Sequence, residues 1–162
     1  MSAAHSNHRL LVIWHSRTGA SEAMARAAAG DHAAVLRARD VSACDLIDAG
    51  AYLFVCPENL ASMSGEMKEM FDRHYYSVLG KIEGRPYASI IAAGSNGEGA
   101  QRQLDRIATG WRLKRVADAM IVNFAAQTAE EILAAKVVEG KTLKNCCELG
   151  QALTEGLALG IF

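Results

Sequence analysis

Residues 10–21 read LLVIWHSRTGAS, and this stretch decides the fold. Its first five residues, Leu10 to Trp14, form a continuous apolar run of the kind found in a strand buried on both faces of a sheet. Polar residues and Gly19 follow, and the alanine-rich segment from Ala20 to Ala29 has good helix propensity. The stretch therefore predicts a buried strand, a tight polar turn and the start of a helix.

Counted over the whole chain, strand and helix alternate in this order about five times. Further strands are predicted at residues 33–38, 51–56, 86–93 and 118–123. Further helices are predicted at residues 42–49, 64–76, 100–113 and 142–158, with another beginning at Thr128. Such alternation favours an α/β domain with a parallel sheet that helices cover on both faces. Residues 1–8 are polar and are expected to be a disordered lead-in, which leaves residues 9–162 as a single domain.

Composition narrows the class of protein. The chain has 162 residues, of which 51% are hydrophobic and 22% charged, as in a soluble globular protein. A net charge of −1 gives no electrostatic footprint for nucleic acid or an anionic membrane. No apolar run is long enough to span a membrane, and no metal-binding motif is present. We expect a cytoplasmic protein whose cysteines stay reduced, namely Cys44, Cys56, Cys146 and Cys147.

The turn after the first strand is a candidate phosphate site. Backbone N–H groups at a helix N-terminus favour an anion, and Gly19 permits a tight turn. The hydroxyls of Ser16, Thr18 and Ser21 add hydrogen-bond donors, and Arg17 can add charge. The turn carries neither GxGxxG nor a Walker A motif. An ordinary helix N-cap is the alternative, although three hydroxyls in six residues exceed what a cap needs.

Two more unusual loops follow the third and fourth strands. The first, residues 57–65, offers Asn59 and free amides to the edge of a planar ring, and Leu60 and Met63 to its face. Its alternative is a plain turn with Met63 in the core. The second, residues 94–99, is rich in glycine and either lets a ligand approach the backbone or is a flexible turn. Since ligands in a doubly wound sheet bind beyond the carboxyl ends of the strands, all three loops are expected to meet at one site.

These residues resemble a known family. The segment from Ser16 to Ser21 is similar to the flavodoxin phosphate signature, (S/T)-x-T-G-x-(S/T). The segment from Pro57 to Lys68, followed by Phe71-Asp72-Arg73, resembles the ring loop and helix of NAD(P)H-dependent FMN reductases and related quinone reductases. The resemblance runs from Arg9 to about Ala158. It implies a flavodoxin-like fold, with a five-stranded doubly wound parallel sheet, and FMN as the cofactor.

The resemblance also implies roles for individual residues. Residues 16–21 would hold the FMN phosphate, residues 57–60 and Met63 would line the ring, and the glycine-rich loop would lie at its other side. No catalytic acid, nucleophile or metal ligand has a counterpart, because the flavin itself exchanges hydride. The cofactor-binding residues implied are Ser16, Arg17, Thr18, Gly19, Ala20, Ser21, Pro57, Glu58, Asn59, Leu60, Met63, Gly94, Ser95, Asn96, Gly97 and Gly99.

The function expected is an oxidoreductase that passes hydride from NAD(P)H to a quinone, a flavin or a similar small acceptor. Neither ring loop contains Trp, Tyr or Phe, and an uncovered ring face suits hydride exchange better than one-electron transfer. One alternative is a flavodoxin-like electron carrier without turnover of its own, and another is a binding module that has lost FMN. A homodimer is implied by the resemblance alone.

Overall fold

The computed structural model describes residues 9–162, so the expected disordered lead-in at residues 1–8 lies outside the described part of the chain. Its centre is a parallel sheet with the strand order β2-β1-β3-β5, and both β6 and β7 pair with β5. A short antiparallel strand, β4, pairs with the end of β3. The strands are β1 (Leu10–Trp14), β2 (Ala34–Arg37), β3 (Ala51–Asn59), β4 (Ser62–Met63), β5 (Pro86–Ala93), β6 (Lys114–Arg115) and β7 (Met120–Asn123).

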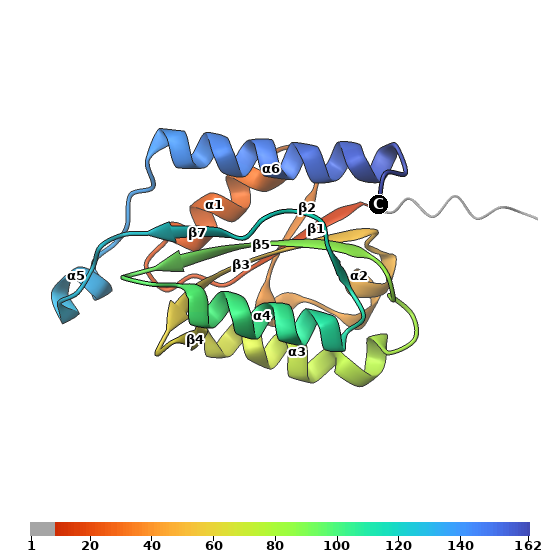
Figure 1. Ribbon diagram of the computed structural model, residues 1–162, viewed down its shortest axis with the longest axis horizontal. Helices are drawn as coiled ribbons and strands as arrows, with labels where there is room; N and C mark the ends of the chain where they lie inside the picture. Colours follow the sequence, from red (N-terminus) through yellow and green to blue (C-terminus); the bar gives the residue numbers. More distant parts are fainter. Residues whose placement is uncertain (1–8) are drawn as a thin grey trace, which may run out of the picture.

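Helices cover both faces of the sheet, and this confirms the predicted α/β architecture (Figure 1). One face packs against α1 and α6, and the other against α3 and α4. The short α5 projects from one end of the molecule (Figure 1). The helices are α1 (Ala20–Ala29), α2 (Ala43–Asp48), α3 (Gly65–Val78), α4 (Glu98–Gly110), α5 (Ala129–Leu133) and α6 (Gly140–Ala158), with a 3-10 turn, η1 (Ala38–Asp40), after β2.

The central strand β3 shows why helices are needed on both faces. Tyr52 and Phe54 belong to the apolar cluster beneath α3 and α4, whereas Leu53 and Val55 belong to the cluster beneath α1 and α6. All four side chains are fully buried. Because successive side chains on a strand point to opposite faces, a run that is apolar at every position is buried only between two layers.

Helix α1 lies unusually close to α6. A Cβ atom added to Gly150 of α6 would overlap the carbonyl oxygen of Ala28 in α1. Ala25, Ala28 and Ala29 of α1 are buried. Small side chains thus let the two helices pack almost backbone to backbone, and this packing holds α1, whose first turn belongs to the candidate site.

The prediction that the third strand ends at Cys56 is wrong. Strand β3 continues to Asn59, and Pro57 still pairs with Ala92 of β5. Proline lacks the N–H donor of a regular strand residue. The carbonyl oxygen of Pro57 nevertheless accepts a hydrogen bond from the Ser64 N–H at 3.1 Å. The first part of the predicted ring loop is therefore strand rather than loop.

The predicted fifth strand is shorter than expected and shares its place in the sheet. Strand β7 begins at Met120 rather than at residue 118, and it pairs with the second half of β5. The two-residue strand β6 pairs with the first half of β5, at Pro86 and Tyr87. The sheet thus has five parallel positions, and the last is divided between two short strands.

Candidate cofactor-binding site

The carboxyl ends of the parallel strands meet at one edge of the sheet, at the left of Figure 1. A cleft opens there. Ligands of open parallel sheets bind at this edge, beyond the carboxyl ends of the strands. The cleft is lined by Arg17, Thr18, Ala20, Pro57, Glu58, Asn59, Ala92, Ala93, Gly94, Phe124, Ala126, Ile132 and Lys136.

The loop after β1 has the geometry of an anion site. Gly19 is the N-cap of α1 at φ 96°, and no side chain caps this helix, so the alternative of an ordinary Ser or Thr cap is not realised. The Gly19 N–H donates to the Ser16 hydroxyl at 3.0 Å. The Ser21 hydroxyl is buried and has no hydrogen-bond partner within residues 9–162. An unpaired buried polar group is costly, so Ser21 and the free N–H groups of the first turn fit a ligand with acceptor oxygens.

A segment near the end of the chain completes this loop. The backbone N–H of Lys136 donates to the carbonyl oxygen of Thr18 at 2.9 Å. The Lys136 ammonium donates to the carbonyl oxygens of Glu131 at 2.6 Å and Ala134 at 2.7 Å. Lys136 therefore caps the end of α5 with its side chain and ties that helix to the loop after β1 with its backbone.

Glu58 lines the cleft, but its carboxylate is engaged elsewhere. One oxygen accepts from the Gly97 N–H at 2.9 Å and the other from the Ala100 N–H at 3.0 Å. These groups lie at the N-terminus of α4, where a carboxylate is favoured by the helix dipole. The sequence predicts that Glu58 lines a ring. In the structure its carboxylate also fixes the start of α4 to the end of β3.

Leu60 and Met63 do not line the cleft, contrary to the prediction. Strands β3 and β4 form a tight hairpin whose two turn residues, Leu60 and Ala61, have φ values of 52° and 60°. Leu60 at the tip is fully exposed. Met63 is buried in the cluster beneath α3 and α4, which is the alternative that the sequence left open. Asn59, just before the turn, is the ring-edge candidate that does line the cleft.

Most of the glycine-rich loop serves packing. Gly94 lines the cleft, and a Cβ there would lie 2.8 Å from the carbonyl oxygen of Ala126. Gly97 has φ 89° at the N-cap of α4, and a Cβ on Gly99 would overlap the carbonyl oxygen of Ala61. Ser95 and Asn96 are exposed and do not line the cleft. These residues join α4 to the hairpin and to β7, and the contact of residues 95–99 with a ring stays a prediction.

The sequence analysis missed one whole side of the cleft. Phe124 follows β7 directly, and its N–H donates to the carbonyl oxygen of Ala93 at 2.8 Å. Together with Ala126, Ile132 and Lys136 it forms the wall opposite β3. The sequence does hold a signal for this wall: the fifth predicted strand, like the others, should end at the edge where ligands bind, so the residues after it are also candidates. The loops after the third and fourth strands contain no aromatic residue, whereas the loop after β7 contributes Phe124.

His15, at the end of β1, lies next to this site in a charged cluster. Its Nε2 is 3.9 Å from a carboxylate oxygen of Glu66, and its buried Nδ1 has no partner in the described part of the chain. Burial, with smaller effects from Arg37 and Arg17, lowers the pKa of His15 although Glu66 opposes this. Burial alone would raise the pKa of Glu66, but two hydrogen bonds from Arg37, at 2.9 and 3.2 Å, bring the net pKa below its usual value. His15 is therefore mostly neutral at pH 7, and Glu66 is ionised.

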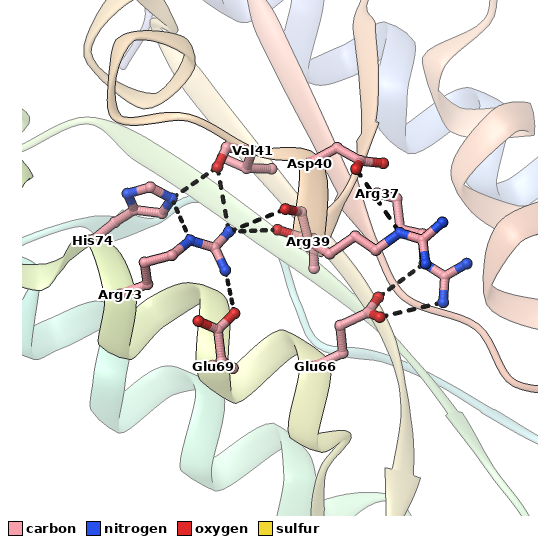
Figure 2. Close-up of polar contacts among 9 residues, drawn as sticks. Arg37, Arg39, Asp40, Val41, Glu66, Glu69, Arg73 and His74 are labelled. Carbon is pink, nitrogen blue, oxygen red and sulfur yellow. Dashed lines mark hydrogen bonds and ion pairs between the residues drawn. The ribbon is translucent and has the colours of Figure 1, made fainter.

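Figure 2 shows how this cluster joins helix α3 to the segment after β2. One Arg73 nitrogen donates to the carbonyl oxygens of Ala38 at 3.1 Å and Val41 at 3.3 Å. His74 is buried, with Nε2 2.8 Å from the Val41 carbonyl oxygen, and Arg73 also pairs with Glu69. These contacts fix the second half of α3, at Arg73 and His74, to the segment after β2.

Within residues 9–162 no group of three or more His, Cys, Asp or Glu side chains could hold a metal ion. The helices in this range are too short or too polar to cross a membrane.

A family model described as NADPH-dependent FMN reductase matches residues 19–130. No curated protein matches the chain. Among solved structures, the chain is similar to a flavodoxin from the domain Archaea, with a TM-score of 0.73 and 18% identity over 92% of this chain and 98% of that one. It is also similar to a flavodoxin, WrbA-like protein from Agrobacterium tumefaciens, with a TM-score of 0.66 and 16% identity over 92% and 99% of the two chains. A flavone reductase gives a TM-score of 0.72 and 15% identity over 92% of this chain and 62% of its own. At these identities the structures establish the flavodoxin-like fold.

Proposed function

The chain belongs to the NADPH-dependent FMN reductase family, and from this premise we propose that it is an FMN-dependent oxidoreductase that passes hydride from NAD(P)H to a small acceptor. The acceptor is a quinone, a free flavin or a similar ring compound. The protein acts in the reducing cytoplasm, where thiols such as those of its four free cysteines stay reduced. As in the family it resembles, a homodimer is the expected assembly.

The hydroxyl of Ser21, which is buried and has no hydrogen-bond partner within residues 9–162, carries this proposal. A phosphate of FMN would accept hydrogen bonds from Ser21, from Thr18 and from the first N–H groups of α1, at the positive end of the helix dipole. Arg17 is exposed beside the same loop and would add charge.

The other walls of the cleft suit a flat ring. Asn59 and the backbone of Gly94 would supply hydrogen bonds to its edge, and Phe124 would supply an apolar surface. Phe124 also packs against the core beneath α1 and α6, so its position is supported from behind. These residues bind and orient the ring, while the bound FMN supplies the hydride chemistry.

The overall reaction needs no acid or nucleophile from the chain. The C4–H bond of the reduced nicotinamide breaks, and its hydrogen leaves with both electrons. A quinone that receives this hydride also takes one proton from water and becomes a hydroquinone. The task of the protein is therefore to hold the ring with one face accessible, and pKa-tuned catalytic groups are not required.

The experiment that tests the proposal is a titration of the purified protein with FMN, followed by absorbance. We expect saturable binding with shifted flavin bands, lost in Thr18→Glu, whose carboxylate would repel the phosphate. Thr109→Glu, an exposed position in the last turn of α4, is the control and should bind FMN normally. If neither the wild type nor the control binds FMN, the proposal is wrong.

A second assay separates an enzyme from a passive electron carrier. The FMN-loaded protein is mixed with NADPH or NADH and a quinone, and the loss of reduced nicotinamide is followed. Catalytic turnover supports the oxidoreductase. FMN binding without any turnover would instead support the electron carrier.

A further inference from the structure

Glu58 places a negative charge on the wall of the cleft that no cation of the described chain neutralises. The residue is half-buried and lies between Pro57 and Asn59, which line the cleft beside it. Within residues 9–162 its carboxylate forms no ion pair, and its partners are the N–H groups of Gly97 at 2.9 Å and Ala100 at 3.0 Å. The carboxylate is therefore satisfied by hydrogen bonds and still carries its charge.

The surrounding backbone holds this charge in place. Glu58 pairs with Met63 in the β3–β4 hairpin, and the Met63 N–H donates to the Gln103 side chain of α4 at 2.7 Å. A Cβ on Gly99 would overlap the carbonyl oxygen of Ala61, so the hairpin and α4 are also in close contact. Turning the carboxylate away from the cleft would leave two helix N–H groups without acceptors, which is costly. The charge is thus fixed before any ligand enters.

The positive charges of the cleft lie at its other end. Of the residues that line it, Arg17 and Lys136 are cationic. Arg17 belongs to the loop after β1, and the Lys136 N–H donates to the carbonyl oxygen of Thr18 in that loop. The Lys136 ammonium is held by α5, with the Glu131 carbonyl oxygen at 2.6 Å. A phosphate bound at this loop would lie near both cations, whereas Glu58 lies on the wall that the ring is proposed to meet.

A fixed carboxylate on that wall acts differently on the two redox states of FMN. A hydride brings two electrons and one proton, so its transfer to the neutral ring of oxidised FMN leaves one negative charge on the ring. The carboxylate repels this new charge. The phosphate is present in both redox states, so its own interaction with Glu58 cancels when their affinities are compared. Charges near the ring are one of the means by which a protein tunes a flavin.

We propose that Glu58 sets the redox potential of FMN in this cleft, because its charge weakens the binding of reduced FMN about tenfold relative to oxidised FMN. Tenfold is the lower end of the effect that a neighbouring unit charge has on an ionisation equilibrium. For a two-electron couple it corresponds to about 30 mV. Glu58 thereby makes the bound cofactor a stronger hydride donor towards the acceptor. The inference rests on the proposed function, because it assumes that FMN occupies this cleft.

The test measures the midpoint potential of bound FMN and needs no turnover. FMN-loaded protein is reduced stepwise with dithionite beside a reference dye, slightly above neutral pH, and the flavin absorbance gives the fraction reduced. Glu58→Gln removes the charge and keeps one acceptor for the helix. We expect it to raise the midpoint potential by about 30 mV. Calorimetric titration with oxidised FMN supplies the affinity from which that for reduced FMN follows.

Two further variants separate the charge of Glu58 from its structural role. Glu58→Asp keeps the charge on the wall but is one methylene shorter, so it loses contact with the start of α4. Its stability should fall, and its midpoint potential should stay at the wild-type value. Glu98→Gln removes an exposed charge from the first turn of the same helix, outside the cleft, and should leave the potential unchanged.

Asn59→Asp examines the same wall with Glu58 intact. It adds a second carboxylate without changing the size of the side chain and leaves both hydrogen bonds of Glu58 in place. The midpoint potential should fall by about 30 mV, the opposite direction from Glu58→Gln. If Glu58→Gln does not retain FMN, this variant decides: an unchanged potential would overturn the inference.

The outcomes keep the two proposals apart. If the wild type binds FMN but Glu58→Gln has the same midpoint potential, the charge does not tune the cofactor and the inference is overturned. A shift in Glu58→Asp as large as that in Glu58→Gln would overturn it too, since the hydrogen bonds to α4 would then be the cause. If the wild type does not bind FMN, the proposed function fails first.

Discussion

Glu58, at the end of β3, holds the backbone N–H of Gly97 at 2.9 Å and thereby joins the cleft to the start of α4. The same carboxylate accepts from the Ala100 N–H. The two hydrogen bonds satisfy two orphan donors at the start of the helix, and the helix dipole favours the negative charge there. Glu58 is thus both a wall of the site and the N-terminal cap of a helix on the far side of the hairpin.

Replacing Glu58 by Gln should therefore cost stability. The variant keeps one acceptor but loses the negative charge at the helix N-terminus, so we expect the free energy of unfolding in urea to fall by about 1–2 kcal/mol. Glu98→Gln, an exposed acid in the first turn of the same helix, is the control and should cost about 0.5 kcal/mol or less. If both variants lost the same free energy of unfolding, the hydrogen bonds of Glu58 to the start of α4 would contribute no more than an ordinary exposed charge in the first turn.

Gly150→Ala should be strongly destabilising. The added methyl group would overlap the Ala28 carbonyl oxygen, and α1 and α6 would have to separate. Overpacking of this kind costs about 1–3 kcal/mol or more, measured by thermal or urea unfolding. Gly110→Ala, where a Cβ meets no atom within 4 Å, should instead be neutral or stabilise by about 0.5 kcal/mol. A stable Gly150→Ala protein would mean that the two helices are farther apart than described.

The hairpin tip should tolerate, and gain from, residues suited to a left-handed backbone. The double change Leu60→Asn and Ala61→Gly supplies the Asn-Gly pair that two-residue turns of this type prefer. We expect about 1 kcal/mol of added stability, visible as a higher Tm. The single change Leu60→Ala keeps the strain and should give no gain. A lower Tm for the double variant would contradict the turn geometry.

Stability should depend on the protonation of His15. Its folded pKa lies below the ordinary value of 6.5, mainly because the ring is buried, so the unfolded chain binds the proton more tightly. The stability from neutral His15 is complete above about pH 6.5 and is lost as pH falls through the folded pKa. Urea unfolding between pH 5 and 7.5 should show this decline in wild type and a smaller one in His15→Gln. His32→Gln, an exposed histidine, should behave as wild type.

Much of the architecture is predictable because it follows from unbroken patterns. The apolar run of β1 and the alanine-rich α1 coincide with their predicted places, and β5 has the predicted bounds of Pro86 and Ala93. Ser42 and Thr128 begin α2 and α5 with capping boxes, which are local signals. These elements need no knowledge of distant contacts.

The rest of the site depends on contacts between segments far apart in sequence. Nothing local distinguishes Gly94, which borders the cleft, from Gly99, which allows the hairpin to approach α4. A methionine at position 63 is equally compatible with covering a ring and with filling the core, so the sequence alone does not decide between the two. Phe124 and Ile132 become site residues only because β7 brings them to the shared edge, and a two-residue strand such as β6 has no periodicity to detect.

The division of the last strand position has a consequence for self-association. An exposed sheet edge with free N–H and C=O groups can recruit a strand from another molecule and start a fibril. Here that edge consists of two short pieces, and the first of them, Lys114–Arg115, is exposed and carries two positive charges. A neighbouring chain would meet an interrupted, charged border instead of a continuous template. This edge of the sheet is thus a poorer template for the addition of a strand than one continuous strand would be.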